Sequence, residues 1–216
     1  MRAPVVLLVL GTALAVGVPS AWALTRPDPT AGPPVASVLS TPPSTPGPAP
    51  ATPPPLVAAH PAAPSPAVPV VPPVRLQLDG VDAPLDPVGV DDAGGMALPE
   101  DVDRVGWYRF GPPPGVAEGT AVLAGHVDDA EQGLGALAPL RTVEVGAEVR
   151  VTDAAGAVTR WRVVSRELVE KPSVPLDALF DRTGPPRLVL VTCGGEFVPE
   201  LRSYRDNVVV VAEPVP

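Results

Sequence analysis

The sequence has few residues of the kinds that build disulfide frameworks, metal centres or nucleic-acid surfaces. It contains a single cysteine, Cys193, which excludes a disulfide bond within the chain. Only 15 lysine and arginine residues stand against 24 aspartates and glutamates, with no basic stripe, so we expect no nucleic-acid partner. It has no phosphate-binding loop, no dinucleotide fingerprint and no clustered metal ligands, and we therefore expect neither a cofactor nor a metal.

Proline, in contrast, is abundant and concentrated in the first third of the chain. Twenty of the 34 prolines lie between Pro4 and Pro73. The chain begins with Met1-Arg2 and an uncharged, largely apolar run over residues 3–24, which contains an Ala-x-Ala pattern at residues 21–23. Residues 1–23 are therefore predicted to be a signal peptide or, if uncleaved, an N-terminal membrane anchor. Either alternative places the rest of the chain outside the cytoplasm.

Residues 24–73 are rich in proline and alanine, with threonine, serine and valine between them. Proline removes backbone donors and favours an extended polyproline II conformation, so this segment is predicted to be a disordered linker that serves as a semi-stiff spacer. Residues 74–216 are long enough to fold as one domain without cross-links.

The pattern of residues 74–216 is mostly that of β-strands, because apolar and polar residues alternate or short apolar runs lie between turn residues. Strands are predicted at residues 75–78, 83–90, 120–124, 148–152, 158–164, 188–192 and 207–212. Helical signal is limited to a short helix at 175–180 and a turn within 133–140. Many short strands with glycine and proline turns favour a closed barrel or a sandwich.

Two chemically reactive residues stand where predicted buried strands end. His126, the one histidine in residues 74–216, follows the run at 120–124, and Cys193 follows the run at 188–192. Arg205 precedes the last predicted strand, 12 residues after the cysteine. A thiolate can attack a carbonyl carbon, an imidazole can transfer protons, and a guanidinium can stabilise an oxyanion. Cys193, His126 and Arg205 are therefore a candidate catalytic set for acyl transfer.

Each of these residues also has a structural interpretation. A lone cysteine after an apolar strand is more often a core residue, and a lone histidine after glycine is more often structural. The arginine would equally fit a surface ion pair with Asp206 or Glu200, and Arg202 competes for the catalytic role. Residue chemistry alone leaves these alternatives open.

Short motifs around the three residues resemble those of the sortases, a family of cysteine transpeptidases. The stretch 190–193, Leu-Val-Thr-Cys, resembles the family's Thr-Leu-x-Thr-Cys signature, with Val189 in place of the first threonine. Ala-Gly-His at 124–126 matches the family's strand end, and Arg205 lies at the family's usual interval after the cysteine. Further blocks resemble class F sortases of high-GC Gram-positive bacteria at residues 105–108, 119–128, 192–195 and 203–210. The resemblance covers nearly all of residues 74–211.

The resemblance implies a mostly β fold, a closed eight-stranded barrel with one or two short helices. It implies a transpeptidase that cleaves a Leu-Pro-x-Thr-Gly-type sorting signal of a protein substrate through a thioacyl-enzyme. An amine acceptor such as a cell-wall precursor peptide, or water, then takes up the acyl group. Cys193 would be the nucleophile, His126 the acid and base, and Arg205 the oxyanion or substrate-backbone ligand. Substrate contacts are implied for three further residues, Thr192, Leu168 and Val174.

Two other functions fit parts of the pattern. An L,D-transpeptidase also uses cysteine, histidine and arginine, but its His-Gly and Ser-x-Gly-Cys motifs are absent here. A non-catalytic extracellular peptide-binding domain with a sortase-like fold is the alternative from another functional class. We expect a monomer at the extracellular side of the membrane or in the cell wall, and we expect the acidic residues Asp128, Asp129 and Glu131 to be solvated.

Overall fold

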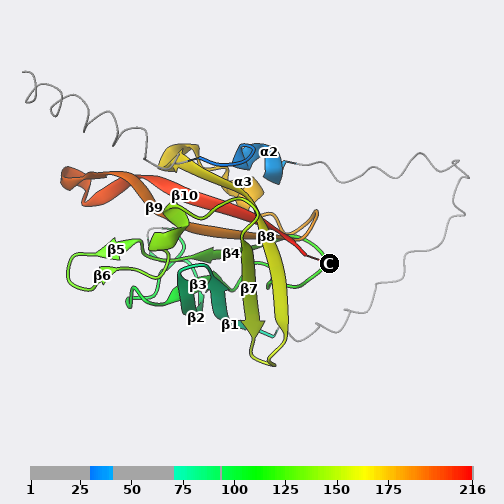
Figure 1. Ribbon diagram of the computed structural model, residues 1–216. Coiled ribbons are helices and arrows are strands. Elements are labelled where there is room, and N and C mark those ends of the chain that lie inside the picture. Colours follow the sequence, from blue (N-terminus) through cyan, green and yellow to red (C-terminus); the bar gives the residue numbers. More distant parts are fainter. Residues whose placement is uncertain (1–29, 41–70, 93, 216) are drawn as a thin grey trace, which may run out of the picture.

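Eight strands of the computed structural model, which describes residues 30–40, 71–92 and 94–215, close into one barrel (Figure 1). Around the barrel the strands follow the order β1-β2-β3-β4-β9-β10-β8-β7. They are β1 (Pro73–Leu78), β2 (Val81–Val88), β3 (Val105–Tyr108), β4 (Thr120–Ala124), β7 (Glu148–Asp153), β8 (Val158–Glu170), β9 (Arg187–Val198) and β10 (Ser203–Pro214). This confirms the predicted closed eight-stranded β-barrel.

The remaining elements are short and lie between the barrel strands or before them. They are the strand pair β5 (Asp128–Asp129) and β6 (Gly133–Leu134), the α-helices α2 (Val35–Leu39) and α3 (Leu176–Leu179), and the 3₁₀ turns η1 (Ala138–Arg141), η2 (Lys171–Ser173) and η3 (Pro199–Leu201). The predicted helix at 175–180 corresponds to α3, and η1 overlaps the end of the turn predicted within 133–140. No helix in the described part of the chain is long and apolar enough to cross a membrane. The signal peptide or anchor predicted for residues 1–23 lies outside the described residues.

Side-chain alternation on β9 and β10 divides the apolar residues between two clusters. Leu188 and Leu190 point into the barrel, where they pack with residues of β1, β2, β3, β7 and β8. Val189 points the other way and packs with Val209, Val211 and residues of α2 and α3. Because successive strand residues face opposite sides, Thr192 belongs to the interior side and Cys193 to the outer side.

The pairing of β4 with β9 brings together two segments that are distant in the sequence. These strands run parallel, and Ala124 lies beside Val191 in their register. The Gly125 amide continues the ladder by donating to the Val191 carbonyl at 3.2 Å. β4 ends at Ala124, while β9 continues past Val191 to Val198, so the residues that follow β4 lie beside the middle of β9.

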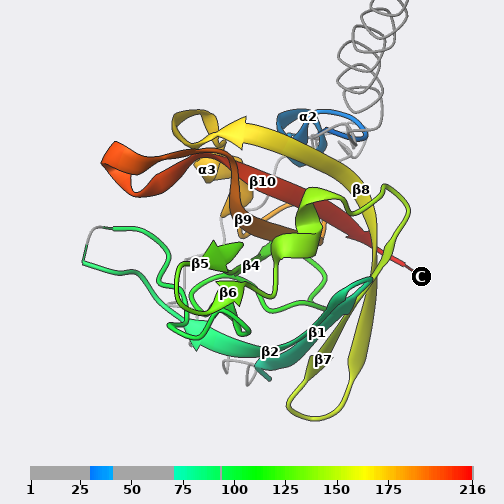
Figure 2. The same cartoon turned by 60° about the vertical axis from the view of Figure 1, so that its left-hand side comes forward.

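Residues 30–40, which fall in the predicted linker, are folded against the barrel. Ala31 bridges to Arg166 of β8, and helix α2 then lies beside α3, over β8 and β10 (Figures 1 and 2). Val35 is fully buried and Leu39 nearly so. The Val35 amide donates to the Glu167 carboxylate at 2.6 Å. This part of the segment is a docked strap instead of a spacer; the rest of the predicted linker up to residue 70 lies outside the described residues.

Candidate active site

Cys193 and His126 come together where β4 ends beside β9. Each residue lies two positions beyond the last pair of this register, Ala124 with Val191. Both side chains are partly exposed and line one pocket of about 270 Å³. The pocket lies between the hairpin of β9 and β10 and the β5–β6 loop, which project from the same side of the barrel (Figure 1). The predicted nucleophile and the predicted acid–base residue therefore share one solvent-accessible site.

The walls of this pocket come from the segment after His126 and from the β9–β10 hairpin. Its lining consists of His126, Val127, Asp128, Asp129, Ala130, Cys193, Phe197, Arg202, Ser203 and Tyr204. Phe197 and Tyr204 pack edge to face, with ring centroids 5.3 Å apart. The hairpin is thus held as a unit beside the cysteine.

A backbone carbonyl fixes the imidazole of His126. Its Nε2 lies 3.1 Å from the oxygen of Pro99, in the segment that leads into β3. Because a carbonyl oxygen can only accept a hydrogen bond, this contact requires the proton on Nε2. The other ring nitrogen, Nδ1, is then the one available to take a proton and return it.

Thr192 links β9 to the end of β4. Its side chain is buried on the interior side of the barrel, and its hydroxyl donates to the Gly125 carbonyl at 2.8 Å. The hydroxyl therefore ties the residue before Cys193 to the residue before His126. In this arrangement Thr192 does not line the pocket, in contrast to the substrate contact that the sequence resemblance implies.

Asp128 and Tyr204, which both line the pocket, are joined by a hydrogen bond. The Tyr204 hydroxyl donates to the Asp128 carboxylate, and the guanidinium of Arg141 lies 5.3 Å from the centre of the Tyr204 ring. The hydrogen bond to Asp128, followed by burial, raises the pKa of Tyr204. Asp128 is therefore bound by the hairpin, although the sequence had suggested a solvated side chain.

The other two acidic residues after His126 form a local turn. The Asp129 carboxylate accepts the backbone N–H groups of Glu131 and Gln132, at 2.8 and 3.0 Å, and these bonds lower the pKa of Asp129. Among the described residues, no group of three or more histidine, cysteine, aspartate or glutamate side chains could hold a metal ion.

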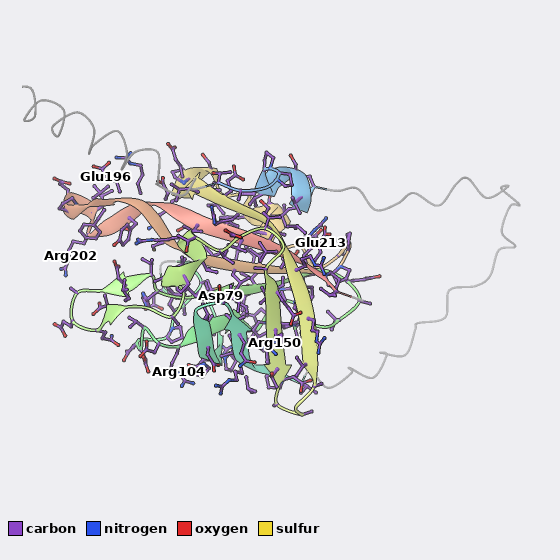
Figure 3. All side chains as sticks on the ribbon, in the orientation of Figure 1. Asp79, Arg104, Arg150, Glu196, Arg202 and Glu213 are labelled. Atoms are coloured by element: carbon purple, nitrogen blue, oxygen red, sulfur yellow. The ribbon has the colours of Figure 1, made fainter. Side chains whose placement is uncertain are left out.

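Arg205 and Arg202 hold different positions on the β9–β10 hairpin. Arg205 lies at an irregularity in the pairing of β10 with β9, and its guanidinium pairs with the Glu196 carboxylate at 2.5 Å. Both partners are more than half exposed. Arg202, which has a left-handed backbone conformation, lines the pocket together with Cys193. Figure 3 shows Arg202 and Glu196 at the projecting tip of the hairpin.

Leu168 and Val174 lie outside the cysteine pocket. Leu168 packs against the barrel core, and a Cβ added at Gly194 would come within 2.9 Å of its side chain, so it contacts the strand next to Cys193. Val174 packs against the outer cluster with Val191 and α3. Both are partly buried. Val174 therefore lies on the outer side of the barrel, as the cysteine does, whereas Leu168 lies on the interior side.

Comparison with known proteins decides the family. The model of the sortase domain matches residues 79–215, which is more than half of the chain. The chain belongs to the sortase family. Comparison of the sequence with curated proteins gives no match.

Solved sortase structures have the same fold. A lid mutant of sortase A from Corynebacterium diphtheriae superimposes with a TM-score of 0.51 at 18% identity, covering 68% of this chain and 71% of that one. Sortase C1 from Streptococcus suis gives a TM-score of 0.51 at 15% identity, covering 67% and 74%. The lid mutant of sortase C1 from Streptococcus agalactiae gives 0.50 at 16% identity, covering 66% and 69%. At these identities the likeness shows the fold.

Several residues of this sortase site were not singled out from the sequence. The Pro99 carbonyl that holds His126 is a backbone group, so no side-chain pattern marks it. Tyr204 and Phe197 lie in the predicted loop between two strands, and their shared contact depends on the folded hairpin. Tyr204 is one of only two tyrosines in the chain and stands next to Arg205, which was the one available signal.

Proposed function

We propose that this sortase is a cysteine transpeptidase that cleaves a Leu-Pro-x-Thr-Gly-type sorting signal and transfers the acyl fragment to an amine acceptor. The observation that carries the proposal is the shared pocket of Cys193 and His126 where β4 ends beside β9. The sequence blocks that resemble class F sortases support a place in that class. The apolar run at residues 3–24 supports action at the outer side of the cell membrane.

In the first half-reaction the Cys193 thiolate attacks the carbonyl carbon of the signal's threonine. The tetrahedral intermediate collapses, the C–N bond breaks, and protonated His126 gives its proton to the leaving amine. A thioester between Cys193 and the threonine remains. In the second half-reaction an amine attacks the thioester, His126 accepts the proton of the attacking amine, and the thiolate leaves. With water as the acceptor the same steps give hydrolysis.

Arg205 is proposed to stabilise the oxyanion or the substrate backbone after it releases Glu196. Exposed ion pairs contribute about 0–1 kcal/mol, so a negatively charged oxygen at the site competes readily for the guanidinium. Leu168 and Val174 are proposed to contact the signal's apolar residues, because Leu168 packs beside Gly194, the residue after Cys193, and Val174 packs with Val191 in the outer cluster. Thr192 is proposed to act on the substrate only indirectly, by holding the two strands together.

The test is to trap the acyl-enzyme. Full-length protein is incubated with a library of Leu-Pro-x-Thr-Gly peptides, without an amine acceptor, and analysed by intact-mass spectrometry. We expect a covalent adduct on Cys193 that is absent in Cys193→Ala, and release of the adduct when an amine is added. If no peptide gives an adduct while iodoacetamide still labels Cys193, the transpeptidase assignment is wrong and a peptide-binding domain becomes the better interpretation.

A further inference from the structure

Asn207 of β10 stands directly opposite Cys193 of β9. The two residues are partners in the antiparallel register, which is regular from Asp206 to Ala212. Val209 and Val211, two and four positions further along β10, belong to the outer cluster, and so does Val189 of β9. By alternation, Asn207 and Cys193 therefore project from the same outer face. Both side chains are partly exposed.

The side-chain amide of Asn207 can reach a group that reacts at the Cys193 sulfur. Side chains directly opposite each other in an antiparallel pair have Cβ atoms about 4.5–5.5 Å apart. The asparagine amide extends two bonds beyond its Cβ and can donate two hydrogen bonds. Within the described residues, this side chain forms no hydrogen bond. Its donors are thus available on the face where the nucleophile stands.

Asn207 is also held more firmly than the arginine of the site. It lies in the regular part of the ladder, one residue before a run of four buried valines. Arg205 lies on the other side of the irregularity and is paired with Glu196 in an exposed position. A donor on a paired strand keeps its position while charge develops, and this is what oxyanion stabilisation requires.

We propose that Asn207 is a further catalytic residue, whose side-chain amide donates a hydrogen bond to the oxyanion formed when Cys193 attacks a carbonyl group. The inference rests on the proposed function in that it takes Cys193 as the nucleophile. Asn207 would hold the oxygen from the β10 side, and Arg205 would add its charge from the hairpin. The donor takes part in no bond making or breaking, so the proton balance of both half-reactions is unchanged.

The test compares two reactions of the same sulfur in Asn207→Leu, which has a similar volume and no donor. Acylation by a simple thioester of N-acetylthreonine passes through an oxyanion, whereas alkylation by iodoacetamide does not. We expect acylation to slow by about 100- to 1,000-fold in this variant, with the alkylation rate within about twofold of wild type. Glu213→Leu, a second polar-to-leucine change at the opposite end of β10, is expected to leave both rates unchanged (Figure 3).

Two results would overturn the inference. Equal slowing of both reactions would show that Asn207 supports the position of Cys193, and unchanged acylation would show that it has no role at the oxyanion. The simple thioester needs no recognition of a sorting signal. A wild type that reacts with the thioester but with no Leu-Pro-x-Thr-Gly peptide would refute the proposed substrate, and the comparison of rates would still test the role of Asn207.

Discussion

We predict that the hydrogen bond between Thr192 and Gly125 holds the next residues, Cys193 and His126, in position. Thr192 is 2% exposed, and its hydroxyl lies 2.8 Å from the Gly125 carbonyl oxygen. Thr192→Val keeps the shape of the side chain and removes the donor. Thr192→Ser keeps the donor and removes one buried methyl group. The two variants therefore separate the hydrogen bond from the packing.

The expected losses of unfolding free energy follow from the burial of Thr192 and Gly125. In Thr192→Val the Gly125 carbonyl loses its donor in a buried position, which costs about 1–3 kcal/mol of unfolding free energy. In Thr192→Ser the loss of one methyl group costs about 1 kcal/mol. Because the bond joins the residues before His126 and Cys193, we also expect Thr192→Val to lower the rate of acyl transfer, with Thr192→Ser close to wild type.

Urea denaturation followed by tryptophan fluorescence measures the first effect, since Trp107 and Trp161 are buried in the same barrel core. Rates of acyl-enzyme formation by intact-mass spectrometry measure the second. The reasoning is refuted if Thr192→Val is as stable as wild type. A loss of peptide reactivity without any loss of stability would instead support direct contact of the hydroxyl with the substrate, as the sequence resemblance implied.

Two further predictions concern the strap and the pocket. Val35→Ala removes two methyl groups from a fully buried side chain. We therefore expect the free energy of unfolding in urea to fall by about 1.5–2.5 kcal/mol and hydrogen exchange over residues 30–40 to become faster. If both stay unchanged, the strap does not dock in solution. The contact with Asp128 raises the pKa of Tyr204 and so favours the neutral phenol. The contact therefore stabilises the fold below the ordinary pKa of 10.0, and this stabilisation is lost as the pH rises through the pKa of the folded state. We therefore expect the wild type to lose more stability than Tyr204→Phe between about pH 9 and pH 12, and equal losses would count against the contact.

The alternation of apolar residues was sufficient to predict most barrel strands, and it fails where polar residues are buried. β8 was predicted to end at residue 164 and continues to Glu170. Ser165 and Arg166 interrupt the apolar pattern, yet both are buried: the Ser165 hydroxyl donates to the Pro33 carbonyl, and the Arg166 guanidinium to the Val143 carbonyl. The partners of these two residues lie far away in the sequence, so no local pattern reveals them.

The strap was missed for a similar reason. Val35 and Leu39 are four residues apart, the spacing of one helix face, but they stand in a segment whose composition is that of a linker. Their burial depends on the outer face of β10, where Val209 and Val211 offer an apolar surface. A helix of five residues has little stability of its own and forms here because that surface covers it.

For the site, the sequence predicts Cys193 and His126 at strand ends, but it does not say that the strands are neighbours. The prediction is wrong for Cys193, because β9 continues to Val198. Parallel pairing of β4 with β9 joins segments whose candidate catalytic residues are 67 positions apart. The family resemblance implies that Cys193 and His126 lie close together, and the pairing of β4 with β9 in the barrel is the physical cause. The same reasoning explains why Asn207 was noticed only as part of a motif: its position opposite Cys193 is a property of the register.

The choice between Arg205 and Arg202 depends on geometry that the sequence does not contain. The sequence favours Arg205 because it stands next to the predicted last strand, with Arg202 in the loop before it. In the structure the strand begins at Ser203, and its pairing is irregular between Tyr204 and Asp206. That irregularity places Arg205 beside Glu196 and leaves Arg202 at the pocket. A long exposed side chain paired with a single exposed carboxylate can change partners at a cost of about 1 kcal/mol or less, whereas Asn207 cannot leave the face of β10. Under the proposal, the Asn207 amide would fix the position of the oxyanion, and the arginine would supply positive charge once a substrate is bound.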